Sequence, residues 1–159
     1  MTKILAWHFL PKDCRLRWGG KELVRPGTTI SVSSPLEMCI HGLHASEKIL
    51  DALGYAPGPV VCRVELSGEI LVDSDKLCAA ARACLWLGDA TRVLHEFACW
   101  CAEQALQQQR EIGKEPARES WAAIQAKRDW LAGKISDKQL DAARDATWAA
   151  ARAAARDAP

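Results

Sequence analysis

The chain has 159 residues, the size of one compact domain, and we expect no second independent hydrophobic core. Hydrophobic residues make up 49% of the sequence and charged residues 26%, a composition that excludes a largely disordered chain. The formal net charge of +1 gives no general attraction to nucleic acids or membrane surfaces. A partner must therefore be recognised through local features.

The cysteine content indicates the compartment. The chain contains seven cysteines, an odd number that does not suit a framework of paired disulfides. The first ten residues lack the charged start and long apolar stretch of a secretory signal peptide. No apolar run approaches the roughly 20 residues needed to cross a bilayer. We therefore expect a soluble protein in a reducing cytoplasm.

The first half of the chain is predicted to form short strands separated by turns. Strands are expected at residues 3–9, 15–18, 21–24, 28–32 and 36–40, with a Gly19-Gly20 turn between the second and third. A short helix is expected at residues 46–53, with Ser46 as its N-cap and Gly54 at its end. Residues 60–66 and 69–72 are expected to pair as a hairpin.

Helical periodicity dominates after residue 73. Helices are expected at residues 74–84, from 89 or 91 to 110, at 116–132, and from a Ser136–Gln139 capping box to 157. Residues 85–87 could instead form a short buried strand, because three apolar residues do not define a period. These elements predict an α+β fold: N-terminal antiparallel strands with one short helix, followed by a C-terminal helical half. The expected domains are an α+β core at 1–110 and a helical hairpin extension at 111–159.

The densest group of reactive side chains lies between residues 39 and 46. Cys39, His41 and His44 are potential metal ligands, but structural zinc sites use two ligand pairs and no second pair has suitable spacing. A nucleophilic cysteine beside a histidine would need an orienting third group, and none is recognisable. We therefore predict no metal site, no cofactor and no catalytic residue.

The same segment favours anion binding. The helix expected at 46–53 would present unpaired N–H groups and the positive end of its dipole beside His44 and Ser46. Arg17 belongs to a cluster of basic residues between Lys12 and Arg25 that could contact phosphate. The alternatives remain open: an ordinary N-cap beside a half-buried histidine, and a solvated hairpin face.

The helical half carries a candidate surface for a protein partner. Trp7, Trp86 and Trp100 lie in apolar runs and are expected in the core, whereas the other tryptophans, Trp18 included, lie beside charged residues. The last helix is rich in alanine, and its arginines and Trp148 recur at steps of four. A solvated helix face is the alternative interpretation. The candidate partner-binding residues are Trp121, Trp130, Arg144, Trp148 and Arg152.

Two motifs carry a resemblance to a known group of proteins. Gly42-Leu43-His44-Ala45-Ser46 and Val64-x-x-Ser67-Gly68 resemble a family of uncharacterised phage and prophage proteins, over residues 4–102. The alanine-rich tail resembles the tails of some members. The resemblance implies phage origin and expression in the cytoplasm of a bacterial host cell.

The order of elements also resembles that of ADP-ribosyltransferases. The resemblance implies NAD-contacting positions at His8 or Arg17, then at His44 and Ser46, then at Tyr55. The sequence departs from that family because no late glutamate ends a predicted strand. His44, Ser46, Arg17 and Tyr55 are therefore our candidate ligand-binding residues.

These features lead to a primary hypothesis and two others. The primary one is a non-enzymatic phage accessory protein that binds a bacterial protein or defence complex, or a small anionic nucleotide, and inhibits an antiviral defence (anti-CRISPR or similar). The alternative is an ADP-ribosyltransferase-like or other enzyme that uses NAD or a nucleotide. A homodimer joined through the last helix is a third, structural hypothesis.

Overall fold

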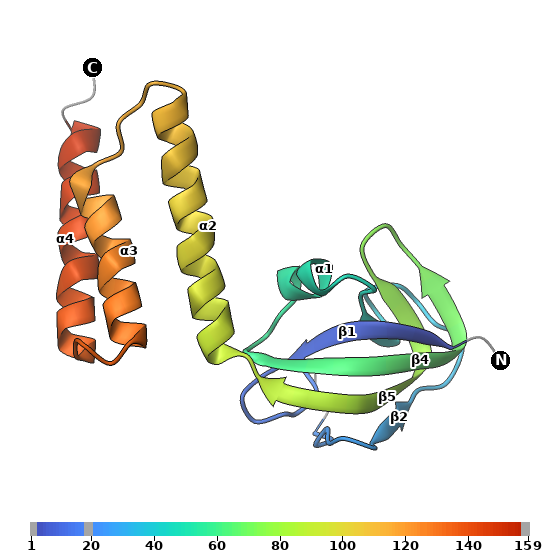
Figure 1. The fold of residues 1–159 in the computed structure, drawn as a ribbon. Coiled ribbons are helices and arrows are strands. Elements are labelled where there is room, and N and C mark those ends of the chain that lie inside the picture. Colours follow the sequence, from blue (N-terminus) through green and yellow to red (C-terminus); the bar gives the residue numbers. More distant parts are fainter. Residues whose placement is uncertain (1–2, 18–20, 157–159) are drawn as a thin grey trace. The chain divides into compact units, whose positions relative to one another are not determined.

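The computed structural model describes residues 3–17 and 21–156, which form two compact units (Figure 1). The first unit ends at Thr91 and contains the sheet; the second, the helical unit, starts at Arg92. This division differs from the expected domains at 1–110 and 111–159. Both units together confirm the predicted α+β class, with strands first and helices after them.

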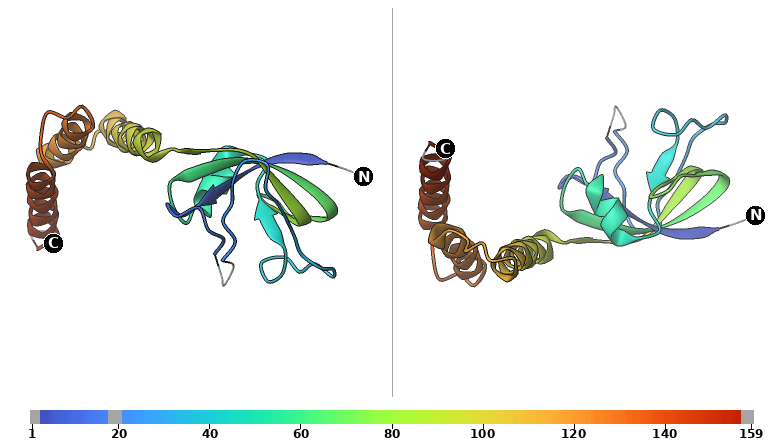
Figure 2. Two further views of the ribbon diagram at one scale, coloured as in Figure 1. Left: turned by 90° about the horizontal axis from the view of Figure 1, so that it is seen from below. Right: turned by 90° about the horizontal axis from the view of Figure 1, so that it is seen from above.

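The first unit is built on an antiparallel sheet. Its strands are β1 (Ile4–Leu10), β2 (Thr29–Ser31), β3 (Leu43–Ala45), β4 (Val60–Val72) and β5 (Leu77–Asp89). The strand order is β1-β4-β5-β2 (Figure 1), and β3 also pairs with β5. Figure 2 gives two further views of the fold. One short helix, α1 (Ile49–Gly54), packs against β1.

The sheet closes on itself through Ser46. Its backbone N–H and carbonyl pair with those of Trp7 at 2.9 and 2.7 Å, so the segment after β3 joins β1. A hydrogen-bonded path therefore runs from β1 through β4, β5 and β3 back to β1. The buried core comprises Ala6, Leu10, Val24, Ala45, Val60, Cys62, Val64, Leu66, Leu77, Ala79 and Cys84.

Two predictions around β4 and β5 are wrong. Residues 60–72 form one continuous strand rather than a hairpin. An irregularity in the pairing between Ser67 and Ile70 accommodates Gly68 without ending the strand. Residues 77–84 of the helix expected at 74–84 belong instead to β5. Alanine favours helices locally, but β5 pairs with β4 on one edge and with β2 and β3 on the other.

The loops before β3 also differ from expectation. Residues 36–40 form a turn rather than a strand, closed by reciprocal backbone hydrogen bonds of 2.8 Å between Glu37 and His41. Cys39 in this turn has a positive φ of 67°, which an extended strand does not contain. The predicted hairpin at 15–18 and 21–24 is reduced to a single bridge between Arg15 and Leu23. The Gly19-Gly20 turn and Trp18 lie outside the described residues.

The helical unit agrees closely with the sequence analysis. Its helices are α2 (Thr91–Glu111), α3 (Arg118–Leu131) and α4 (Asp137–Arg156). The predicted capping box is present: the Ser136 hydroxyl accepts from the Gln139 N–H, and the Ser136 N–H donates to the Gln139 side chain at 2.9 Å. Arg128 of α3 donates two hydrogen bonds to Glu103 of α2. None of the helices in the described part of the chain has the length and apolar character of a membrane span.

Candidate anion-binding pocket

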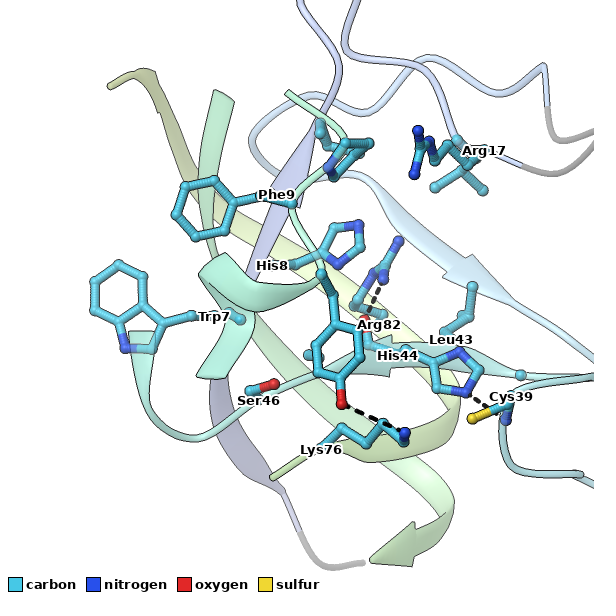
Figure 3. A pocket seen from close by; sticks show the side chains of 18 of the residues that line it. Trp7, His8, Phe9, Arg17, Cys39, Leu43, His44, Ser46, Lys76 and Arg82 are labelled. Atoms are coloured by element: carbon cyan, nitrogen blue, oxygen red, sulfur yellow. Dashed lines mark hydrogen bonds between the residues drawn. The ribbon is translucent and has the colours of Figure 1, made fainter. Parts of the chain in front are cut away.

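The first unit contains a pocket of about 870 Å³ between β1, β3, the end of α1 and the turn at residues 37–41 (Figure 3). This volume is in the range of small-molecule sites. The polar side chains that line it are His8, Arg17, Cys39, His41, His44, Ser46, Tyr55, Lys76 and Arg82. Aspartate and glutamate are absent from this lining in the described part of the chain. The lining is therefore cationic.

Arg82 is the most unusual of these groups. It is only 5% exposed, and its Nη1 donates a hydrogen bond of 2.6 Å to the carbonyl of His44. None of the carboxylates in the described ranges forms an ion pair with it. Burial lowers the pKa of Arg82 to about 10, so it still carries its charge at neutral pH.

Two thiols near Arg82 do not neutralise it. Burial raises the pKa of Cys84, and it raises the pKa of Cys62 to about 12. Both thiols are therefore protonated at neutral pH. Arg82 is a buried cation without a counter-ion among the described residues.

His44 is held in its neutral form. Its Nε2 accepts a hydrogen bond of 3.0 Å from the backbone N–H of Cys39, so this nitrogen carries a lone pair rather than a proton. Burial, followed by the charges of Arg82 and Lys76, lowers the pKa of His44. A protonated Nε2 would lose the bond to Cys39.

His8 lies on β1 beside Arg82 (Figure 3). Burial is the main cause that lowers its pKa well below 6.5, and the charge of Arg82 acts in the same direction. A hydrogen bond to the main chain of His44 opposes this shift. The pocket thus contains two neutral imidazoles around one buried guanidinium.

Tyr55 and Lys76 form one rim of the pocket. The Tyr55 hydroxyl donates a 2.6 Å hydrogen bond to Asp75, which raises the pKa of the phenol. The Lys76 ammonium lies 5.0 Å from the centre of the Tyr55 ring and 3.7 Å from the Asp73 carboxylate. Hydrogen bonds to Cys39 and Tyr55 raise the pKa of Lys76. The two carboxylates stay outside the pocket and hold its rim in place.

Comparison with known proteins identifies the family of this unit. Residues 7–96 match a domain of unknown function, DUF7666. The chain belongs to this family. The matched residues contain the whole pocket lining, from Trp7 to Arg82. Neither the curated proteins nor the solved structures contain a match to this chain.

The DUF7666 domain brings together all four predicted ligand-binding residues: His44, Ser46, Arg17 and Tyr55 line one pocket. The predicted role of Ser46 is wrong. It is 1% exposed, and its backbone is paired with Trp7, so it is in an extended bridge rather than at a helix start. The helix α1 begins at Ile49 with Lys48 as its N-cap, and no side chain caps it.

Sequence reasoning missed Arg82 and Lys76. A signal for Arg82 was present, since it is the single charged residue between Leu77 and Gly88. Arginine is almost never fully buried unless it is paired, so an isolated arginine in an apolar run indicates a paired group or a functional site. The segment was expected to form a helix at 74–84, and Arg82 was not singled out within it.

The candidate partner-binding residues have different environments in the helical unit. Trp130 donates a 2.6 Å hydrogen bond to Asp137 and packs edge-on against His95, while Arg110 lies over the ring of Trp121. Trp148 is 65% exposed, Arg152 is exposed, and Arg144 pairs with Asp141. Partner binding by these residues stays a prediction.

Two of the expected core tryptophans are on the surface. Trp86 and Trp100 are 52% and 53% exposed, because each lies on the outer side of its strand or helix. Of these three tryptophans, Trp7 is partly buried, under the guanidinium of Arg63 at 4.6 Å. Within the described ranges, no group of three or more histidine, cysteine or acidic residues is arranged to hold a metal ion.

Acid is expected to destabilise the DUF7666 domain through its histidines. The pKa values of His8 and His44 are lowered in the folded state, so the unfolded chain binds more protons just below pH 6.5. This stability is fully present above pH 6.5 and is lost as the pH falls, by up to about 1.4 kcal/mol per unit for each histidine. Urea unfolding between pH 7.5 and 5.0 measures it. His8→Gln should flatten the dependence, and an unchanged slope in this variant would contradict the assignment.

Proposed function

We propose that this protein is a non-enzymatic binding protein whose pocket holds a small anionic ligand of the nucleotide class. The observation that carries the proposal is the buried Arg82 guanidinium, which has one carbonyl partner and no carboxylate among the described residues. A buried charge costs several kcal/mol unless an opposite charge pairs with it. A bound anion supplies that charge.

The chemistry of the lining favours a phosphate group joined to a larger body. A guanidinium offers several N–H donors in a planar fork that matches phosphate oxygens. The pocket, at about 870 Å³, is much larger than a phosphate ion, and apolar side chains such as Leu10, Leu16 and Leu43 line the remainder. A nucleotide combines an anionic group with a planar, partly apolar one.

The arrangement favours binding over catalysis. Transfer from NAD needs a carboxylate that organises the ribose or the acceptor, and the described lining offers none. His44 is not a free base, since its Nε2 already accepts the Cys39 N–H. Asp75, an acid at the rim, is engaged by the Tyr55 hydroxyl. An enzyme that uses NAD or a nucleotide remains the alternative to be tested.

This proposal fits the phage setting implied by the sequence motifs. A small protein without catalytic groups can act on a bacterial defence by sequestering a nucleotide signal in the host cytoplasm. It would do so in proportion to its concentration and affinity. The proposed role is therefore that of a phage accessory protein directed against a host antiviral defence.

Isothermal titration calorimetry tests the binding step, with adenosine 5′-monophosphate (AMP), NAD, adenosine and inorganic phosphate as probes. We expect a nucleotide to bind more tightly than adenosine or phosphate. Arg82→Gln should weaken that binding about 10- to 100-fold, the value of charge-assisted hydrogen bonds. Arg82→Lys should retain part of the affinity, and Arg63→Gln, outside the pocket lining, should retain all of it.

Two results would contradict the proposal. One is the absence of binding by any of the nucleotides, or equal binding by the Arg82→Gln variant. The other is release of nicotinamide from NAD, detected by chromatography and abolished by His44→Ala, which would favour the enzyme instead.

A further inference from the structure

His8 and Arg82 come from different strands, and both interact with the main chain of His44. The Nη1 of Arg82 donates to the His44 carbonyl at 2.6 Å, and the His8 imidazole hydrogen-bonds to the main chain of the same residue. Figure 3 shows the two side chains next to each other in the pocket lining. They are therefore fixed side by side before any ligand arrives.

The proton on His8 decides what it can bind. A neutral imidazole has one N–H donor and one lone pair. The donor of His8 is used by the main chain of His44, so the second nitrogen is the one left for a ligand. A phosphate oxygen accepts hydrogen bonds and repels a lone pair. Contact with phosphate requires this nitrogen to be protonated.

The positive charge around His8 opposes protonation of its ring when no anion is bound. The residues that face it from the neighbouring elements are Arg82 on β5, His44 on β3, Cys62 opposite it on β4, Tyr55 after α1 and Arg17 in the loop after β1. Arg82 supplies positive charge beside the ring, and these residues supply no carboxylate. A phosphate dianion bound next to Arg82 reverses the local field, so anion binding and protonation favour each other.

We propose that His8 is the second anion-binding group of this pocket, and that a phosphate monoester binds between Arg82 and His8 as the imidazole takes up one proton. This inference rests on the proposed function. It also names the ligand class: a dianionic phosphate monoester matches Arg82 and a protonated His8, whereas a phosphodiester, with one charge, is neutralised by Arg82 alone.

Calorimetry of AMP binding at pH 7.5, in two buffers that differ in ionisation enthalpy, tests the proposal. The buffer dependence of the heat gives the number of protons taken up. We expect close to one proton for the wild-type protein and close to none for His8→Gln. The affinity of the wild type should fall about tenfold per pH unit between pH 7 and 8.5. His95→Gln, in α2 and outside the pocket lining, serves as the matched control and should behave as the wild type.

Adenosine 3′,5′-cyclic monophosphate, a phosphodiester with the same base and ribose, separates charge from shape. We expect it to bind at least tenfold more weakly than AMP at pH 7 and to take up no proton. Equal affinities for the two nucleotides would overturn the preference for a monoester.

The outcomes separate this inference from the proposed function. If AMP binds and depends on Arg82 but the wild type takes up no proton, His8 is not an anion-binding group and the proposed function stands. If proton uptake persists in His8→Gln, the proton resides on the phosphate and the inference is again wrong. If none of the nucleotides binds, both proposals fail.

Discussion

Replacing Arg82 with methionine is expected to raise the free energy of unfolding of the first unit by about 1–3 kcal/mol, although it removes a positive charge from the proposed ligand site. Methionine has a similar length and no charge, and it can fill the same space among buried neighbours. The guanidinium is 5% exposed and has no counter-ion among the described residues. In the variant, the folded state no longer buries a charge that lacks an opposite partner.

The magnitude follows from the pKa of Arg82. Burial lowers it from 12.5 to about 10. A shift of this size disfavours the charged form by roughly 3 kcal/mol, since one pKa unit corresponds to about 1.4 kcal/mol. The hydrogen bond to the His44 carbonyl offsets about 1–1.5 kcal/mol of this cost. The rest of the cost is a net destabilisation of the folded state by Arg82. A protein retains a destabilising residue of this kind when the residue has a function.

Urea unfolding at pH 7.5, followed by tryptophan fluorescence, measures this difference. Arg63→Met is the control, because Arg63 is partly buried and lies over the ring of Trp7. Its loss should lower stability by about 0.5–1 kcal/mol, the value of a cation–π contact near the surface. A loss of stability in Arg82→Met larger than that of the control would show that Arg82 is a structural group rather than a ligand-binding one.

The helical unit was predictable because its signals are local. The capping box at Ser136 and the apolar stripe of α2 act within one or two turns of the chain. The strand β5 was not predictable in this way. Its run of alanines and cysteines has no strand signal of its own. Its conformation comes from pairing with β4 along one edge and with distant residues along the other, such as Leu43 with Ala79.

The site was predicted in part for the same reason. The Gly42–Ser46 motif identified the correct corner of the fold, but the assumed helix start does not exist, since Ser46 bonds to Trp7 of β1. The burial of Arg82 is a consequence of β5 lying between β4 and β3. Neither fact can be obtained from residues near in sequence, because each depends on a contact between distant strands.

Gly42→Ala is expected to have the largest effect on stability, lowering the free energy of unfolding by about 3–4 kcal/mol through backbone strain and steric overlap together. Gly42 has a positive φ of 142°, a conformation that residues other than glycine rarely adopt. A Cβ at this position would overlap the Sγ of Cys78, whose residue is 0% exposed. Because Gly42 directly precedes β3, the same change should displace His44 and weaken AMP binding.

A double-mutant cycle separates the two causes. In a Cys78→Ala background the overlap is absent, so adding Gly42→Ala should cost at least about 1 kcal/mol less than it does alone. Gly27→Ala isolates the backbone term, since Gly27 has a positive φ of 84° and an added Cβ would meet no atom within 4 Å. It should cost about 1 kcal/mol. If Gly42→Ala and Cys78→Ala were instead additive, the overlap with Cys78 would not be the cause. The backbone conformation at Gly42 would then account for the whole loss, and the excess over Gly27→Ala would reflect the difference in φ between the two positions.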